Sequence, residues 1–156
     1  MTLSIKRTLL SLAAAAALAA SLTGAALAAD AAAEAAFVKA YQAAFDSKNA
    51  GAFSALLAPG GDPTAVQFYT QMMTSEVADG KLTSIALKDL SPEDQANAAA
   101  VQPGPNGNLQ LLPKPYKKLV LHIDTKTADQ TSSADSEVFV ADVGGKVLIS
   151  VPTPVK

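Results

Sequence analysis

The sequence contains no cysteine and no tryptophan, and it has a single histidine. Without cysteine there is no disulfide scaffold, no thiolate metal site, no cysteine nucleophile and no lipid-modified cysteine anchor. One histidine cannot form a typical zinc site unless several carboxylates contribute. The sequence also lacks the Gly-x-Ser-x-Gly motif of serine hydrolases and a glycine-rich phosphate loop. We therefore expect no metal ion and no cofactor, and we assign no catalytic residue.

Charged residues are scarce, and arginine is nearly absent. Of the 156 residues, 17% are charged and 49% are hydrophobic, so a packed core is expected rather than a disordered chain. Beyond residue 28 there are ten lysines, no arginine and 14 acidic residues, which makes the net charge −4. Nucleic-acid binding requires a basic field and favours arginine, so we expect no nucleic-acid partner.

The first 28 residues have the three regions of a secretory signal peptide. Lys6 and Arg7 make the amino-terminal region positive, and an alanine-rich apolar stretch follows it. This stretch covers roughly 14 residues, which is short for a membrane span of about 20. The run Ala26-Leu27-Ala28 is a small-x-small cleavage site. We expect cleavage after Ala28, and the alternative is a segment retained as a membrane anchor.

Cleavage would leave residues 29–156, a length that suits one domain, in the periplasm or outside the cell. Beyond the signal no apolar run is long enough to span a bilayer, so we expect no further membrane contact. The first part of the domain is helical, because its apolar residues recur at three- and four-residue spacing. Three helices are predicted, over residues 30–48, 52–58 and 63–78. Asp62 is the expected cap of the third.

From Gly80 onward the apolar spacing changes to two residues, which is typical of strands. Strands are predicted over residues 81–90, 109–112, 116–126, 137–143 and 146–151. A short helix from Ser91 to Ala100 interrupts them, and residues 127–136 are expected to form a polar loop.

The end of the chain indicates how the strands pair. Gly144-Gly145 predicts a hairpin turn, and Pro152 is expected to end regular structure. Helices followed by antiparallel strands make an α+β fold, in which amino-terminal helices pack on one face of a curved antiparallel sheet.

Two segments resemble a known superfamily. The opening FVKAYQAAFDSKNAGAFSALLAP resembles the first helices of nuclear transport factor 2-like domains, and the closing VFVADVGGKVLISVP resembles their last hairpin. The resemblance covers most of residues 34–151 and implies a cone-shaped roll with a pocket at its open end. The superfamily includes ketosteroid isomerases, polyketide cyclases and many non-enzymatic binding or dimerising domains, so membership alone does not select a function.

Four large residues on the apolar helix faces are the candidate ligand-binding residues: Tyr41, Phe45, Tyr69 and Met73. They could line a pocket for a small apolar ligand, with a tyrosine hydroxyl to orient it. Alternatively they fill the core, since aromatic and methionine side chains are the main buried mass available. No acidic residue lies within the apolar stripes of the first and third helices.

The strand over residues 116–126 carries the only histidine. Strand alternation directs Leu119, Leu121 and Ile123 toward the helices, and His122 and Asp124 outward. These two polar residues could act as a general base with an orienting carboxylate, or they could simply be exposed.

Three functions remain open on these residues. The leading interpretation is an exported, non-catalytic domain that binds a small ligand or another protein. The alternatives are a small lyase or isomerase, with Tyr41 or Tyr69 as hydrogen-bond donor and His122-Asp124 as base, and a passive envelope protein without a ligand.

A homodimer through the outer sheet face is also expected. Val120 lies centrally on its strand beside polar neighbours, and the spacing places Val138 and Val140 on the same outer face. Valines at positions that are usually polar indicate partial burial, which a second copy of the chain would supply.

The signal-peptide assignment makes the first testable prediction. Exported protein is expected to begin at Ala29, because signal peptidase cuts after a small-x-small site. Amino-terminal sequencing of the secreted or periplasmic protein measures this directly. Exported protein that still began at Met1 would contradict the prediction.

Overall fold

The computed structural model describes residues 31–126 and 131–156. The predicted signal peptide, residues 1–28, lies outside the described residues. The chain divides into two compact units, Met1–Ala32 and Ala33–Lys156, and the second contains nearly everything that is described. Among the described residues, no helix combines the length and apolar character that crossing a membrane requires.

The amino-terminal half is helical, as predicted. A first helix covers residues 31–46, and three labelled helices follow: α2 (Ala50–Ser54), α3 (Pro63–Asp79) and α4 (Pro92–Ala99). The cap assignment of α3 is confirmed, because the Asp62 side chain accepts hydrogen bonds from the backbone amides of Thr64 and Ala65.

The predicted bounds of α2 were wrong at both ends. The helix begins at Ala50 because the Asn49 side chain caps it, accepting from the amides of Gly51 and Ala52. It ends at Ser54, and the next residues run beside strand β6 (Val147–Ile149) instead. There the Ile149 amide donates to the Leu56 carbonyl at 2.8 Å, and the Ala58 amide donates to the Ile149 carbonyl at 2.8 Å. A tertiary pairing therefore replaces the last predicted helical turn.

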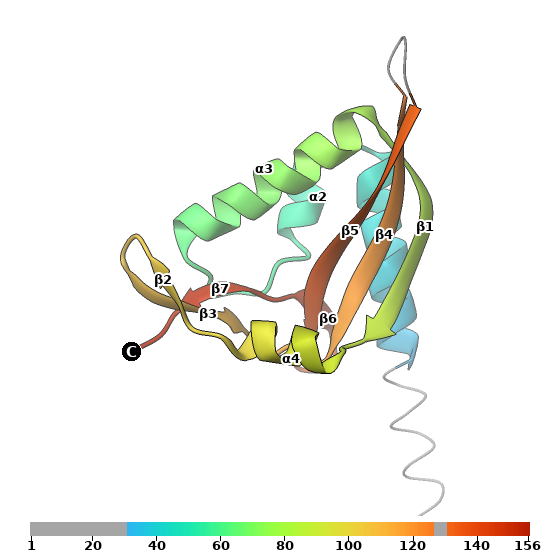
Figure 1. Cartoon of the computed structure of the whole chain (residues 1–156). Coiled ribbons are helices and arrows are strands. Elements are labelled where there is room, and N and C mark those ends of the chain that lie inside the picture. The colour runs from blue at the N-terminus through green and yellow to red at the C-terminus, as the bar shows by residue number, and fades with distance from the viewer. Residues whose placement is uncertain (1–30, 127–130) are drawn as a thin grey trace, which may run out of the picture. The chain divides into compact units, whose positions relative to one another are not determined.

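The described strands form two antiparallel sheets (Figure 1), which confirms the α+β fold class. The larger sheet has the order β1-β4-β5-β6, with bounds Gly80–Asp89, Lys117–Lys126, Thr131–Asp142 and Val147–Ile149. The smaller sheet has the order β2-β3-β7, with bounds Gln102–Gly104, Gly107–Leu112 and Val151–Pro154. Gly144 and Gly145 both have positive φ, of 62° and 82°, in the turn between β5 and β6, as the hairpin prediction requires.

Strand pairing changes three predicted boundaries. Residues 131–136, predicted as loop, belong to β5, because each of them pairs with a residue of β4. The predicted strand 146–151 is divided at Ser150, whose amide donates to the Phe139 carbonyl while the next residue starts β7. Pro152 was expected to end regular structure but lies within β7. Its missing N–H is tolerated there because β7 is the edge of its sheet.

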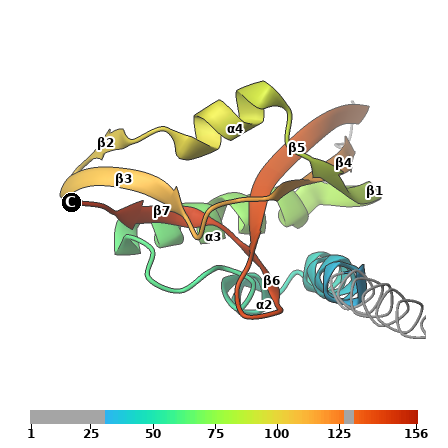
Figure 2. The same cartoon turned by 90° about the horizontal axis from the view of Figure 1, so that it is seen from below.

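One face of the larger sheet packs against the helices. Figures 1 and 2 show the first helix on one side of this sheet and α4 on the other. Leu119, Leu121 and Ile123 are buried in the core, as predicted, together with side chains from the other elements: Phe37, Tyr41, Ala44, Phe45, Phe53, Leu57, Met73, Val77, Val138, Val140, Val147, Ile149 and Val151.

A bulge in β1 interrupts the alternation of its side chains. The register with β4 shifts between Leu82 and Ser84, so Leu82 and Ile85 face the core and Thr83 does not. The Thr83 hydroxyl donates instead to the His122 carbonyl at 3.0 Å.

The predicted position of two valines was wrong. Val138 is 4% exposed and Val140 is 0% exposed, so both belong to the core rather than to the outer face. The pairing explains this, because Val138 lies opposite the inward-facing Leu119 and alternation places Val140 on the same side. Neither valine can contribute to an outer dimer interface, and the homodimer stays a prediction without them.

Replacing Val140 by lysine tests the corrected face. Val140→Lys should destabilise the fold by about 3 kcal/mol or more, because it buries an unpaired charge. The matched control is Val120→Lys, at a half-buried position on the opposite face of the sheet. Urea unfolding measures both changes. Equal stability of the two variants would contradict the assignment.

Candidate functional site

A cavity of about 930 Å³ lies between α4, β3 and the segment that joins β3 to β4. We call it the α4 cavity. Its size falls within the range of small-molecule sites, about 300–1,000 Å³. Its wall is about equally apolar and polar, and five of its twelve lining residues carry polar groups: Asp89, Gln95, Gln110, Lys114 and Tyr116.

The first turn of α4 is held by a capping box. The Asp94 carboxylate accepts from the Ser91 amide at 2.9 Å and from the Ser91 hydroxyl at 2.8 Å, while the Asp94 amide donates to the Ser91 hydroxyl at 3.1 Å. The Lys118 ammonium lies 3.0 Å from the Asp94 carboxylate and 2.9 Å from that of Glu137. This joins the helix to the larger sheet.

The contacts in this network favour the ionised forms of Asp94 and Lys118. Hydrogen bonds from Ser91, and then the contact with Lys118, lower the pKa of Asp94. The contacts with Glu137 and Asp94 raise the pKa of Lys118. At neutral pH the connection between α4 and the sheet is therefore a charged one.

Two glutamines line the cavity with oriented amides. The Gln110 amide nitrogen donates to the Ala99 carbonyl at 2.8 Å, and the Gln95 amide nitrogen donates to the Leu90 carbonyl at 3.3 Å. A carbonyl oxygen can only accept, so each bond requires the nitrogen to be on that side of the amide. The side-chain oxygen of each glutamine can then accept a hydrogen bond from a ligand or from water. Neither oxygen has a donor among residues 31–126 and 131–156.

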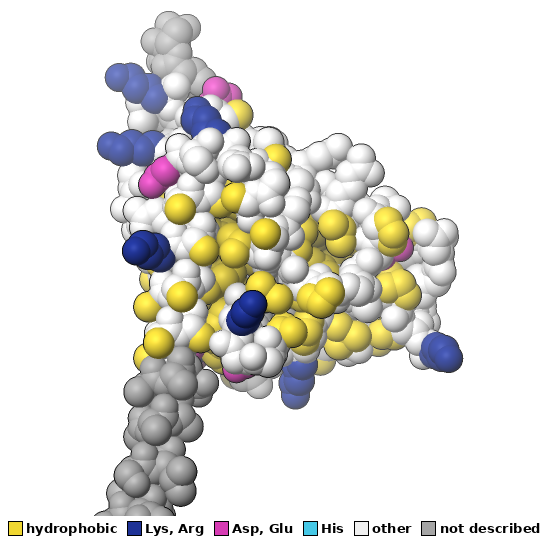
Figure 3. All heavy atoms as spheres, turned by 180° about the vertical axis from the view of Figure 1, so that it is seen from behind, with side chains coloured by type: hydrophobic (Ala, Val, Ile, Leu, Met, Phe, Trp, Pro, Cys, Tyr) yellow, Lys and Arg dark blue, Asp and Glu magenta, His cyan; other side chains and the backbone are white. Residues whose placement is uncertain are grey.

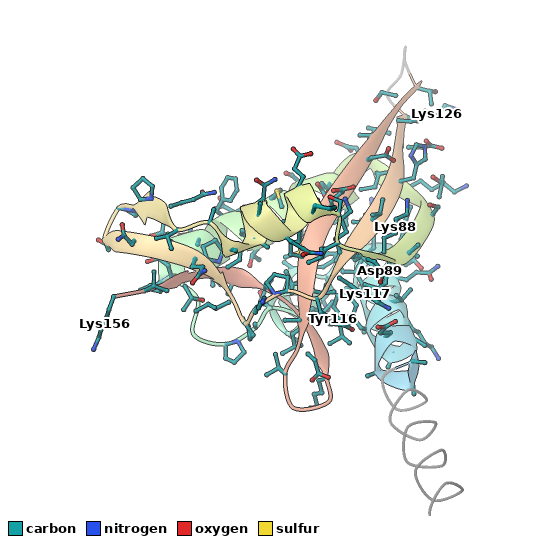
Figure 4. The ribbon with its side chains drawn as sticks, turned by 60° about the horizontal axis from the view of Figure 1, so that its bottom comes forward. Lys88, Asp89, Tyr116, Lys117, Lys126 and Lys156 are labelled. Atoms are coloured by element: carbon teal, nitrogen blue, oxygen red, sulfur yellow. The ribbon has the colours of Figure 1, made fainter. Side chains whose placement is uncertain are left out.

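The first helix supports the far wall of the cavity. The Tyr116 hydroxyl donates to a Glu34 carboxylate oxygen at 3.1 Å, and the Lys117 ammonium lies 2.8 Å from the same carboxylate. Figure 4 shows Asp89, Tyr116 and Lys117 near the place where β1 ends and β4 begins. Tyr116 is therefore positioned by Glu34.

Three of the four predicted ligand-binding residues lie in the core. Tyr41, Phe45 and Met73 are each at most 3% exposed, and the Tyr41 ring packs edge-on against Phe53 at 5.3 Å. None of the three lines the α4 cavity or the two smaller cavities described here. Burial, and then Glu76, raise the pKa of Tyr41.

Tyr69, the fourth, lines a cavity of about 210 Å³ beside the carboxyl-terminal end of α4. Burial raises its pKa as well. Its neighbours there include Asn97 and Leu109, so the structure places Tyr69 near the α4 cavity but not in it. The ligand-binding role of all four residues stays a prediction.

The residues of the α4 cavity were missed because they follow no apolar period. The Ser91 capping pattern predicted α4, yet it does not say which segments of the chain the helix faces. Sequence analysis also missed Glu76 on α3, whose carboxylate accepts from the Ser136 hydroxyl at 2.8 Å on the inner side of the sheet.

His122 lies on the outer sheet face, as predicted, and its side chain is 44% exposed. Its Nδ1 lies 2.6 Å from an Asp135 carboxylate oxygen, and its Nε2 lies 3.8 Å from that of Asp124. Asp135 was not part of the predicted pair. Tyr41 belongs to the core on the opposite side of β4, so the groups of the lyase alternative are not assembled in one place.

The described residues contain no group of three or more histidine, cysteine or acidic side chains placed to hold a metal ion.

No protein-family model and no curated protein matches this chain. Among solved structures it is similar to the helical cell shape determining protein Pgp2 from Campylobacter jejuni, with 12% sequence identity and a TM-score of 0.42. The match covers 76% of this chain and 38% of that chain, so this chain spans less than half of that protein. A likeness of this strength defines neither a fold family nor an activity.

The surroundings of His122 predict a raised pKa in the folded chain. The hydrogen bond to Asp135 is the main cause, and the charges of Asp135 and Asp124 add to it. A raised folded pKa means that His122 adds stability below its unfolded pKa and loses this contribution as the pH rises through the folded pKa.

Nuclear magnetic resonance titration measures this pKa without ambiguity, since the chain has one histidine. Asp135→Asn should lower the pKa toward the ordinary value of 6.5, and Asp124→Asn should lower it less. Asp124→Asn is the matched control, because the Asp124 carboxylate lies farther from the His122 ring than that of Asp135. A pKa at or below 6.5 in the unaltered chain would refute the interpretation.

Proposed function

We propose that this chain is an exported, non-catalytic domain that binds a small, mainly apolar ligand in the α4 cavity. The observation that carries the proposal is the cavity itself, about 930 Å³ with apolar and polar surface in nearly equal parts. Small-molecule sites combine these properties, because apolar burial supplies affinity and placed polar groups supply orientation. Export rests on the predicted signal peptide.

The contacts around the cavity support a pocket that is formed before ligand arrives. Its α4 wall is tied to the larger sheet through Asp94 and Lys118, and to β3 through Gln110. Its opposite wall is tied to the first helix through Glu34. A preformed pocket spares the ligand the entropic cost of ordering its walls.

The cavity also favours this proposal over the alternative of a passive envelope protein without a ligand. A passive envelope protein needs no cavity of ligand size, whereas this domain has one beside α4. The lyase alternative gains no support, because His122 and Tyr41 lie on opposite faces of β4.

A protein partner is the other half of the leading interpretation. Figure 3 shows hydrophobic side chains over a broad area of the face behind the view of Figure 1, with lysines scattered around it. More than half of the surface of folded proteins is apolar, so this area does not favour a protein partner over a small ligand.

We further propose membership in the nuclear transport factor 2-like superfamily. The support is the order of the elements, with helices first, an antiparallel sheet after them, and a Gly144-Gly145 hairpin near the end. The proposal predicts a non-enzymatic member, since a ligand-sized cavity is described without an assembled set of reactive groups beside it.

Filling the cavity tests the proposed function. Nile red, a neutral polarity-sensitive dye, should bind the native chain with one site, and Ala96→Trp should weaken binding at least about tenfold by occupying the space. Ala96 lines the cavity from α4, whereas Glu93 on the same helix does not. Glu93→Trp is therefore the matched control and should bind dye like the unaltered chain.

Fluorescence titration, with a thermal melt to verify folding, measures all three proteins. Absence of dye binding to the unaltered chain, or equal loss in both tryptophan variants, would overturn the assignment of the site.

A further inference from the structure

Two unpaired opposite charges line the α4 cavity. Asp89 contributes from the end of β1, and Lys114 contributes from the segment between β3 and β4. Neither forms an ion pair or a hydrogen bond through its side chain with any residue that the structure describes. From this pair we propose that the cavity binds a short apolar peptide with free termini, its ammonium toward Asp89 and its carboxylate toward Lys114. The inference rests on the proposed function.

The two lysines of β4 that lie nearest to Asp89 across the strands already have carboxylate partners. Lys117 lies opposite Asp89 across the strands, but its ammonium contacts Glu34. Lys118 contacts Asp94 and Glu137. Neither Lys117 nor Lys118 is therefore left to neutralise Asp89 at the cavity wall.

The backbone around Lys114 is held in place. Pro113 and Pro115 flank it and restrict the chain, and Pro115 is buried. The Pro113 carbonyl accepts from the Ser150 hydroxyl at 2.8 Å. Lys114 consequently projects its charge from an anchored segment rather than from a free loop.

The two glutamines add acceptors that a peptide would use. Because their amide nitrogens donate to the Leu90 and Ala99 carbonyls, the side-chain oxygens of Gln95 and Gln110 remain to accept. A peptide has an ammonium and at least one backbone N–H to donate. Acceptor oxygens on the wall therefore match the donors that a peptide carries.

Size and charge together narrow the ligand class. Cavities near 930 Å³ hold drug-sized molecules, so a single amino acid would leave most of this space unfilled. A ligand with one charge would displace water from both Asp89 and Lys114 but pair with one of them only. A zwitterion pairs with both, while Leu111 and Leu112 contact its apolar side chains.

Calorimetric titration of the full exported chain with leucyl-leucine, which has free termini, tests the proposal. N-acetyl-leucyl-leucine lacks the ammonium and leucyl-leucinamide lacks the carboxylate. We expect each modification to weaken binding at least about tenfold, since each removes one charge pair.

Substitutions assign each terminus to its partner. In Asp89→Asn the free and acetylated dipeptides should bind alike, whereas the amide should still bind more weakly. In Lys114→Gln the free and amidated dipeptides should bind alike, whereas acetylation should still weaken binding. Lys88→Gln and Glu93→Gln change charge beside the cavity without altering its lining, and they should leave the discrimination intact.

Competition with Nile red keeps this inference separate from the proposed function. Dye binding that leucyl-leucine does not displace would overturn the peptide assignment and leave a ligand-binding cavity. Equal binding of the free and modified dipeptides would overturn the role of the two charges. Failure of both dye and dipeptide to bind would overturn the proposed function as well.

Discussion

Burial of one face of β4 is the constraint on which the rest of the structure depends. Leu119 and Leu121 are fully buried against the helices, and each such side chain contributes about 1.5–3 kcal/mol. Because β4 pairs along its length with β1 and β5, its inward face determines which residues of both neighbours also face inward. Val138 and Val140 join the core for this reason.

The opposite face of β4 organises the cavity. Lys118 must point outward once Leu119 points inward, and from there it reaches Asp94 on α4. A partly exposed pair of this kind adds only about 0–1 kcal/mol to stability. Its importance is positional, because it holds one wall of the α4 cavity against the larger sheet while Gln110 holds the same helix to β3.

The residues that line the α4 cavity do not belong to the buried core cluster. Its wall comes from the end of β1, from α4, from β3 and from the proline-flanked Lys114, which are segments far apart in the sequence. The large aromatic residues that first suggested a pocket, Tyr41 and Phe45, instead complete the core beneath the sheet. The proposed ligand site is thus separate from the hydrophobic core.

Local patterns in the sequence determined the helices, the capping residues Asp62 and Ser91, the Gly144-Gly145 turn and the buried face of β4, because each depends on neighbours within a few residues. The α+β class follows from their order. Only tertiary structure decided the inward face of Val140, the second sheet and the cavity. Strand register and contacts between distant segments do not produce a periodic pattern of apolar residues in the sequence. That Asp89 and Lys114 have no partner among the described residues belongs to this second group, because it depends on which side chains the fold brings near them.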